Sequence, residues 1–355
     1  MFEFYKNIKV LVTGHTGFKG SWLTIWLLQK GAKVVGYALD PTNNNDNFVR
    51  SNLADKITDY RRDIRDFNDF KEIVDKENPE IIFHLAAQPL VLKSYENPLY
   101  TIQANTLGTA NVLEAFRQSK SAKVLILITT DKVYRNNEWH WGYRENDQLG
   151  GHDPYSGSKA AAEMLIQSYE QSFFSSGGKY IATVRAGNVI GGGDWSENRI
   201  VPDCIKAIEN EVPIAIRNPN AIRPWQHVLE PLGGYLYLAE QLLMDKKQYK
   251  GVWNFGPFYS NIVNVEQLVQ AIIKNYGKGD YYIQSVGKIY KESSLLSLDI
   301  SKAINILKWK PVLEFDETIE FTVYWYKRYK DENVFELCCK QIEQYERLWK
   351  LRNTN

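Results

Sequence analysis

The feature that most constrains the fold is a glycine-rich turn between an apolar segment and a helical one. Gly14, Gly17 and Gly20 are spaced three residues apart in the string GHTGFKG. The turn follows a predicted buried strand over Ile8–Thr13 and opens a predicted helix that runs from Gly20 to about Lys30. In such a turn the first glycine allows the bend, the second lets backbone N–H groups approach a pyrophosphate, and the third lets helix and strand pack closely. We therefore expect a dinucleotide whose pyrophosphate meets the positive end of the helix. The predicted contacts in this turn are Gly14, Thr16, Gly17, Phe18 and Gly20.

Short apolar runs alternate with amphipathic stretches through the first half of the chain. Further strands are predicted at Lys33–Tyr37, Ile81–Leu85, Val124–Thr130 and Tyr180–Ala186, and further helices at Leu99–Gln118 and Tyr155–Phe174. Strands that alternate with helices predict an α/β fold with a doubly wound parallel sheet of the Rossmann type. Such a sheet binds its ligand beyond the carboxyl ends of its strands.

The length of 355 residues predicts two lobes. After Val189 three consecutive glycines, 191–193, introduce shorter segments that are rich in proline, asparagine and aromatic residues, whereas Trp225–Leu243 again has the pattern of a strand and a helix of the first lobe. We expect a nucleotide-binding domain formed by residues 1–187 and 225–254. A smaller, mixed α/β substrate-binding lobe is expected from residues 188–224 and 255–355.

Asp40 ends the second predicted strand, about 20 residues beyond Gly20, where Rossmann folds place the ribose-binding carboxylate. A carboxylate there binds the adenosine ribose hydroxyls and repels a 2′-phosphate, which favours NAD over NADP. The alternative interpretation is an ordinary turn aspartate before Pro41. Asp63 and Ile64, just after the third predicted strand, are the expected adenine contacts.

Composition excludes several other classes of protein. The formal net charge is +1 and the basic residues are scattered, so we expect neither nucleic acid nor an anionic membrane as partner. No apolar run is long enough to cross a bilayer, and no signal peptide is recognisable. The three cysteines form neither a disulfide framework nor a metal site, which predicts a metal-free protein of the reducing cytoplasm.

A possible catalytic set follows the fifth predicted strand. Thr130, Asp131 and Lys132 lie at its end, and Tyr155 and Lys159 are four residues apart at the start of the next helix, so they share one helix face. A nearby ammonium favours a phenolate and lowers the tyrosine pKa from its usual value of about 10. Such a tyrosine removes the proton of a sugar hydroxyl while hydride leaves the same carbon for a nicotinamide.

These motifs resemble the extended short-chain dehydrogenases/reductases, which modify nucleotide sugars. The resemblance covers nearly the whole chain and includes His84-Leu85-Ala86-Ala87-Gln88, Asn105, Arg185-Ala186-Gly187-Asn188-Val189 and Leu298-Asp299-Ile300-Ser301-Lys302. It implies NAD as cofactor and adds Ala86, Ala87, Gln88, Asn105, Tyr155 and Lys159 to the residues that bind it. It also implies that Asn188, Arg199 and Arg223 bind a nucleoside-diphosphate hexose, a role that suits the planar fork of arginine.

Within the family, an acidic residue after the hydroxyl residue is typical of 4,6-dehydratases, so Asp131 points to dehydration. Four longer strings resemble the group that acts on CDP-glucose: Gly14–Leu23, Glu138–Glu145, Gly187–Trp195 and Ile222–Glu230. Lys132 departs from the TDP-glucose enzymes, which have glutamate there. It is either the base for C5 or a residue that tunes Asp131, and an ordinary solvated lysine is the third interpretation.

Other expectations rest on the family alone. The helices over Leu99–Gln118 and Tyr155–Phe174 form a four-helix seam in a homodimer or dimer of dimers, and the product feeds deoxysugars into surface polysaccharide such as lipopolysaccharide O-antigen. The aromatic cluster of Trp139, His140, Trp141 and Tyr143 either packs internally or lies over the ligand.

Two rival functions remain open at this point. A 4-epimerase shares Tyr155 and Lys159 but gives Asp131 no acid role. A catalytically silent NAD-binding sensor on the same fold is the other rival, although it has no need of Thr130, Tyr155 and Lys159 together. A dehydratase that acts on a UDP- or TDP-sugar is a variant of the favoured reading.

Overall fold

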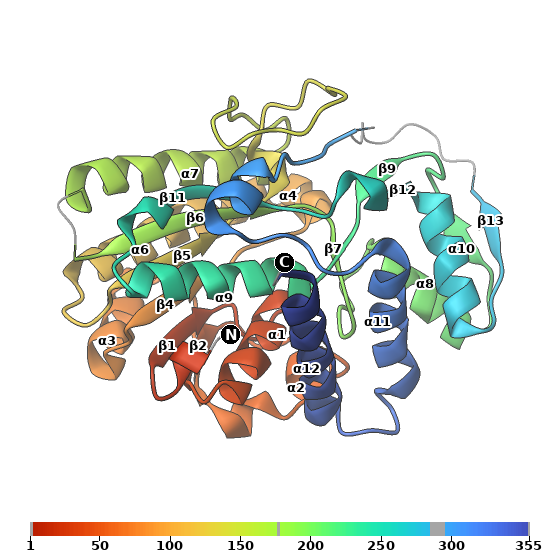
Figure 1. Cartoon of the computed structure of the whole chain (residues 1–355), viewed down its shortest axis with the longest axis horizontal. Helices are drawn as coiled ribbons and strands as arrows, with labels where there is room; N and C mark the ends of the chain where they lie inside the picture. The colour runs from red at the N-terminus through yellow and green to blue at the C-terminus, as the bar shows by residue number, and fades with distance from the viewer. Residues whose placement is uncertain (1–2, 176–177, 285–294, 354–355) are drawn as a thin grey trace.

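The computed structural model describes residues 3–175, 178–284 and 295–353. Its centre is a seven-stranded parallel sheet in the order β11-β6-β5-β4-β1-β2-β3 (Figure 1). The strands are β1 Lys9–Thr13, β2 Lys33–Ala38, β3 Thr58–Arg61, β4 Ile81–His84, β5 Val124–Ile128, β6 Tyr180–Ala186 and β11 Gly251–Phe255. The predicted doubly wound parallel sheet is confirmed.

Helices cover both faces of this sheet. On one face lie α3 Phe67–Glu77, α6 Gly108–Gln118 and α7 Pro154–Phe173, and on the other lie α1 Phe18–Gln29 and α9 Leu229–Leu243. Val10 and Val12 of β1 belong to the core on the α1 side, whereas Leu11 between them belongs to the core on the α3 side. Because successive side chains point to opposite faces and both faces are buried, the strands are continuous apolar runs.

The smaller lobe lies beside the carboxyl edge of the sheet. Its helices are α8 Ile200–Glu209, α10 Val265–Tyr276 and α11 Phe315–Arg328. It also contains two short sheets, formed by β8 Ile214–Ile216 with β13 Tyr281–Ile283 and by β9 Ile222–Pro224 with β12 Ile262–Asn264. A further two-stranded sheet joins β7 Val189–Ile190 of this lobe to β10 Gln226–His227, which the proposed division gives to the nucleotide-binding domain. The proposed division gives residues 255–355 to this lobe, of which 285–294 and 354–355 lie outside the described residues. The last helix, α12 Val334–Asn353, packs against α1 of the nucleotide-binding domain.

Three elements differ from the sequence prediction. The helix predicted over Leu99–Gln118 is continuous, but it contains a π-helical turn, Gln103–Leu107, between α5 Pro98–Ile102 and α6. The strand predicted within Trp225–Leu243 pairs with β7 rather than with the central sheet, whose last strand is β11. β5 ends at Ile128, since Thr130 already caps the short 3-10 turn Asp131–Val133.

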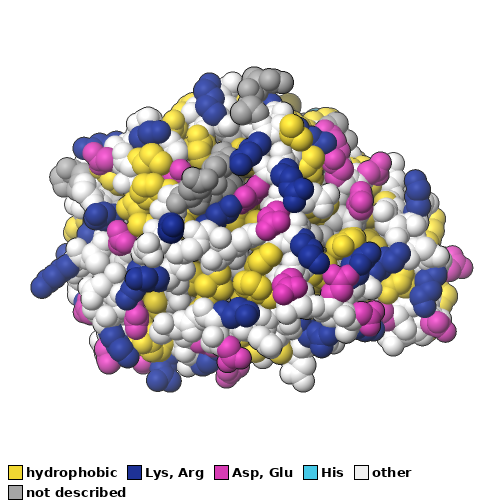
Figure 2. All heavy atoms as spheres, turned by 60° about the horizontal axis from the view of Figure 1, so that its bottom comes forward, with side chains coloured by type: hydrophobic (Ala, Val, Ile, Leu, Met, Phe, Trp, Pro, Cys, Tyr) yellow, Lys and Arg dark blue, Asp and Glu magenta, His cyan; other side chains and the backbone are white. Residues whose placement is uncertain are grey.

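None of the helices in the described ranges is long and apolar enough to cross a bilayer. On the face shown in Figure 2, basic and acidic side chains are interspersed.

Candidate active site

The site lies where the direction of winding reverses. β1 is hydrogen-bonded to β2 on one side and to β4 on the other, so the loops after β1 and β4 diverge at the carboxyl edge. A crevice at such a switch point is where doubly wound sheets bind their ligands. The turn that begins at Gly14 and the loop Leu85–Gln88 lie side by side at this point, because a Cβ on Gly14 would lie 2.7 Å from Ala86 N.

Two glycines of the turn, Gly14 and Gly20, leave no room for a Cβ. Gly14 has φ of 73°, and a Cβ there would lie 2.7 Å from the backbone N of Ala86. A Cβ on Gly20 would lie 2.1 Å from the carbonyl oxygen of Gly14. α1 begins at Phe18 with Gly17 as its N-cap, so its free N–H groups point at the turn. This cradle fits a dinucleotide pyrophosphate.

Two other predicted residues of the turn contact its surroundings. The hydroxyl of Thr16 donates to the carbonyl of Leu39 at 3.0 Å and so joins the turn to the end of β2. Phe18 is partly buried against the core on the α1 side.

Asp40, the predicted ribose-binding carboxylate, lies beyond the end of β2 with 84% of its side chain exposed, and Arg61 Nη1 is 3.4 Å from its Oδ1.

The predicted adenine contacts lie after β3. The carboxylate of Asp63 accepts from Arg65 Nε at 2.9 Å, which holds the Asp63 pKa below its ordinary value despite the opposing effect of burial. Ile64 is buried, and its carbonyl accepts from Asn111 Nδ2 at 2.9 Å.

Asn105 organises the loop after β4. It lies in the π-helical turn, and its side chain bonds both the N–H and the carbonyl of Gln88, at 2.8 and 3.1 Å. Its Nδ2 also donates to Ser158 Oγ of α7 at 2.9 Å. Ala86 N donates to Thr13 Oγ1 at 3.1 Å, and Ala87 lies between these two anchored residues. Asn105 therefore positions the Ala86–Gln88 loop against α7.

Thr130, Asp131 and Tyr155 come together at the end of β5. Thr130 Oγ1 donates to Asp131 Oδ1 at 2.9 Å, and it also bonds Tyr155. Asp131 is 4% exposed, and burial raises the pKa of its carboxyl against the opposing charge of Lys132. Asp153 caps α7 by accepting from Ser156 N at 2.9 Å and so fixes the helix start that presents Tyr155.

The expected effect of Lys159 on Tyr155 is wrong for this structure. Burial raises the pKa of Tyr155 to about 12, and the hydrogen bond with Thr130 lowers it only in part. Lys159 Nζ donates to the carbonyl of Ile128 at 3.2 Å, and burial lowers its own pKa to about 8. The ammonium is therefore directed at the end of β5, and helical spacing alone did not reveal that direction.

The predicted substrate residues lie on the smaller lobe. Arg199 caps α8 and is paired with Asp194 at 2.7 Å, and its charge acts on Tyr155. Arg223 of β9 donates to the carbonyl of Ile222 at 2.8 Å, and its charge acts on Asp131. Asn188 follows β6, and its carbonyl accepts from Gln226 N at 3.1 Å. The structure thus brings both arginines within electrostatic range of the catalytic set.

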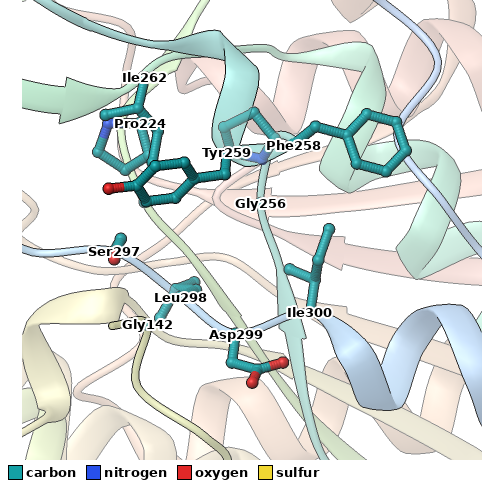
Figure 3. A pocket seen from close by; sticks show the side chains of 12 residues that line it. Gly142, Pro224, Gly256, Phe258, Tyr259, Ile262, Ser297, Leu298, Asp299 and Ile300 are labelled. Atoms are coloured by element: carbon teal, nitrogen blue, oxygen red, sulfur yellow. The ribbon is translucent and has the colours of Figure 1, made fainter. Parts of the chain in front are cut away.

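A cavity opens next to this set (Figure 3). A Cβ on Gly187, one of its lining residues, would lie 3.0 Å from Asp131 Oδ2. In Figure 3 the Tyr259 ring lies close to Pro224 and Ile262, with Ser297 and Leu298 below it. The complete lining is Gly142, Gly187, Pro224, Gly256, Pro257, Phe258, Tyr259, Ile262, Ser297, Leu298, Asp299 and Ile300.

The aromatic cluster packs mainly against itself. Trp139 stacks on Tyr143 with 5.4 Å between the ring centroids, and Tyr143 stacks on Tyr134 at 5.1 Å. Trp141 is 59% exposed and tilts against Trp139. Gly142, within this cluster, lines the cavity, so the loop borders the site.

Sequence reasoning missed two groups near the site. Lys19, in the glycine turn, has its pKa lowered to about 8 by burial and by Arg199, while Asp131 opposes the shift. The signal for it was the unusual lysine in the string GHTGFKG. Glu163, one helical turn after Lys159, is an acidic residue whose charge raises the pKa of that ammonium against the effect of burial. Within the described ranges no three side chains are grouped to ligate a metal.

This arrangement is that of the extended short-chain dehydrogenases/reductases. Residues 11–322 match the family of GDP-mannose 4,6 dehydratases, and the chain belongs to this family. It is 43% identical over 349 residues to CDP-glucose 4,6-dehydratase of Salmonella typhimurium strain LT2, with 97% of each chain covered. It is 30% identical over 324 residues to a putative UDP-glucose 4-epimerase of Methanocaldococcus jannaschii, with 90% of this chain and 98% of the relative covered. The fold is also that of dTDP-glucose 4,6-dehydratase from Bacillus anthracis in complex with NAD, with a TM-score of 0.75, 21% identity, and 93% and 99% coverage.

Proposed function

We propose that this protein dehydrates CDP-glucose to CDP-4-keto-6-deoxyglucose with NAD as a regenerated cofactor. The observation that carries the proposal is the buried Asp131, which has a raised pKa and lies beside both Tyr155's partner Thr130 and the cavity. A buried carboxyl whose pKa is raised holds a proton more readily, which suits a general acid for a leaving hydroxyl. An epimerase has no use for such an acid.

The residues present fit NAD. The glycine cradle and the start of α1 would hold the pyrophosphate, Asp40 the adenosine ribose, Asp63 and Ile64 the adenine, and Lys159 the second ribose. NAD, when bound, supplies the acceptor for the C4 hydride and the donor that returns it to C6.

The protein groups move the protons. Tyr155 removes the 4-hydroxyl proton in its phenolate form, which burial disfavours and which the Thr130 hydrogen bond and the charge of Arg199 favour. Thr130 hydrogen-bonds the substrate oxygen as it becomes a carbonyl. The 4-ketone acidifies the C5 proton, which Lys132 removes directly or through a water. Asp131 protonates the C6 hydroxyl, which leaves as water, and the double bond formed between C5 and C6 is reduced when hydride reaches C6 and a proton returns to C5. The net change is loss of one water.

Two arginines support this assignment of the substrate. The charges of Arg199 and Arg223 act on Tyr155 and Asp131, and they supply the positive charge that a diphosphate requires. Gly187, which lines the cavity, lies next to Asp131. The cytidine preference is supported by the 43% identity with the Salmonella CDP-glucose enzyme.

Purified protein incubated with CDP-, TDP- or UDP-glucose tests the proposal, with NAD added or omitted. The readout is the ultraviolet absorbance that 4-keto-6-deoxy sugars develop in alkali. We expect signal from CDP-glucose and its loss in Tyr155→Phe. Signal only from another nucleotide would overturn the cytidine assignment, and conversion to a 4-epimer without a keto product would overturn dehydration.

We also propose a homodimer whose interface is formed by α5, the π-helical turn that follows it, and α7. Leu99, Ile102 and Leu107 are exposed there, and Met164 and Phe173 expose apolar surface on α7. Leu107→Glu should convert the dimer to a monomer in light scattering.

Cys204, Cys338 and Cys339 are free thiols, which supports a cytoplasmic location.

A further inference from the structure

Arg61 is held in one orientation at the edge of the nucleotide crevice. It is the last residue of β3, two residues after Asp59, so both side chains lie on the same face of the sheet. Arg61 Nε and Nη2 bond the Asp59 carboxylate at 2.8 and 2.7 Å, and the guanidinium lies 4.7 Å from the centre of the Phe48 ring. Only 26% of the Arg61 side chain is exposed.

Asp59 is itself fixed from the opposite side. His15 Nε2 lies 2.7 Å from Asp59 Oδ1, and the His15 ring is fully buried in the glycine turn. The ring occupies the space above Gly36, where a Cβ would lie 2.5 Å from His15 Cδ2. Asp59 therefore holds two groups in place: His15 in the glycine turn, where the pyrophosphate is proposed to bind, and the guanidinium of Arg61 at the sheet edge.

The remaining nitrogen of Arg61 is directed at Asp40. The register pairs Arg61 with Ala38, so Arg61 lies beside the point where β2 ends and the chain runs on to Asp40. Arg61 Nη1 is 3.4 Å from Asp40 Oδ1, and the Asp40 carboxylate is otherwise 84% exposed. A bidentate pair on one side and an aromatic ring beneath leave Nη1 preorganised for one more oxygen.

We propose that Arg61 determines cofactor selectivity: it orients Asp40 toward the adenosine 2′-hydroxyl of NAD, and it binds the 2′-phosphate of NADP once the Asp40 carboxylate is removed. The inference rests on the proposed binding of NAD at this crevice. Rossmann folds select NAD with a carboxylate at this position and NADP with a nearby arginine. This chain has both groups in contact, so removal of the Asp40 carboxylate alone should change the preferred cofactor from NAD towards NADP.

Charge determines whether the site binds the 2′-hydroxyl of NAD or the 2′-phosphate of NADP more tightly. With Asp40 present, a dianionic 2′-phosphate meets a carboxylate whose arginine partner is already engaged, whereas a 2′-hydroxyl donates to that carboxylate without repulsion. With Asp40 neutral, Arg61 Nη1 loses its oxygen partner and a phosphate oxygen replaces it.

The test is calorimetric titration with ADP-ribose and with 2′-phospho-ADP-ribose, which lack the nicotinamide and report binding without turnover. The proteins are the unaltered chain, Asp40→Asn, Arg61→Met, Arg61→Lys, the double variant Asp40→Asn/Arg61→Met, and the matched control Arg62→Met. Arg62 is the next residue, 58% exposed, and its Nε contacts Asp69 rather than Asp40.

We expect the unaltered chain to prefer ADP-ribose, and Asp40→Asn to raise the affinity for 2′-phospho-ADP-ribose by about tenfold. The double variant should lose that gain. Arg61→Met alone should weaken ADP-ribose a few-fold, Arg61→Lys should keep only part of the selectivity because lysine has no fork, and Arg62→Met should change neither affinity.

An Asp40→Asn variant whose gain survives Arg61→Met would overturn the inference, as would an Asp40→Asn variant with no gain. Failure of the proposed function gives a different result, because the unaltered chain would then bind neither ligand. Circular dichroism melting of each variant separates lost binding from lost folding.

Discussion

Glu163 and Arg185 form an ion pair in which 1% and 0% of the side chains is exposed. Arg185 Nε lies 2.8 Å from Glu163 Oε1, and the same carboxylate accepts from Thr129 Oγ1 at 2.6 Å. Thr129 precedes Thr130, and Glu163 follows Lys159 by one helical turn. The pair therefore joins β5, β6 and α7 directly behind the catalytic residues.

Glu163→Gln should leave a buried guanidinium without its counter-charge. We expect the free energy of unfolding to fall by about 3–5 kcal/mol, measured by urea denaturation. The matched control is Glu170→Gln on the same helix, whose contact with Lys250 is 3.6 Å and partly exposed. That control should cost at most about 1 kcal/mol. Equal losses in the two variants would contradict the importance of burial.

Asp131→Asn should raise the stability of the protein and lower its activity. Burial raises the Asp131 pKa, so the folded state favours the protonated form, and the stabilising effect of that form is lost as pH rises through the folded pKa. The amide keeps the shape and carries no charge, so the unfolding midpoint at pH 8 should rise. Without the acid, kcat should fall by about 10²- to 10⁴-fold. A lower midpoint together with unchanged kcat would contradict both parts.

The sequence predicted the framework of this site more completely than its electrostatics. Local spacing located Gly14, Gly20, Tyr155 and Lys159, because a turn and a helix face are short-range features. It did not reveal that Lys159 bonds the carbonyl of Ile128 or that burial raises the pKa of Tyr155 to about 12. Those effects depend on which distant segments cover a side chain, and periodicity contains no such information.

The same limit explains why the π-helical turn was not predicted. Asn105 was placed in the site by resemblance, but the π-helical turn that aims its amide at both Gln88 and Ser158 has no recognised sequence signature here. Likewise, the pairing of Arg61 with Asp40 joins residues 21 positions apart, and it depends on the register of β2 and β3.

Lys132→Met tests the proposed C5 base. If Lys132 removes the C5 proton, kcat should fall by about 10²-fold or more, and exchange of the C5 hydrogen with solvent deuterium, followed by NMR of the product, should slow equally. Lys132 also has the largest charge effect that opposes the raised Asp131 pKa. If that effect is its sole role, the variant will keep C5 exchange and shift the alkaline limb of the pH–rate profile upward.

Gly20→Ala should abolish NAD binding. The added Cβ would lie 2.1 Å from the carbonyl oxygen of Gly14, and both are backbone-fixed, so the turn must open. We expect no heat in a calorimetric titration with NAD and a loss of about 1–3 kcal/mol in stability. Gly157→Ala is the matched control for folding, because nothing lies within 4 Å of its new Cβ in α7. It should add up to about 1 kcal/mol of stability. Retained NAD binding in Gly20→Ala would exclude the turn as the pyrophosphate site.

Glu230 should make the free energy of unfolding depend on pH between about pH 4.5 and pH 7. It is 1% exposed in α9, and its carboxylate accepts from Val312 N and Tyr345 OH, both at 2.8 Å. Burial raises its pKa from an ordinary 4.5 to about 7, so the folded state holds a proton that the unfolded chain releases near pH 4.5. Its contribution is therefore fully present below pH 4.5 and lost as pH rises to about 7, a change of about 3 kcal/mol.

Glu230→Gln keeps an acceptor for Val312 N and has no proton to lose. The difference in free energy of unfolding between the unaltered chain and this variant should shift by about 3 kcal/mol in favour of the variant between pH 4.5 and pH 8, measured by urea denaturation at each pH. Glu336→Gln, at an exposed position of α12, should give a difference that stays flat across the same range. A flat difference for Glu230→Gln as well would mean that the pKa of Glu230 is not raised in the folded state, and that its hydrogen bonds from Val312 N, Leu313 N and Tyr345 OH offset its burial.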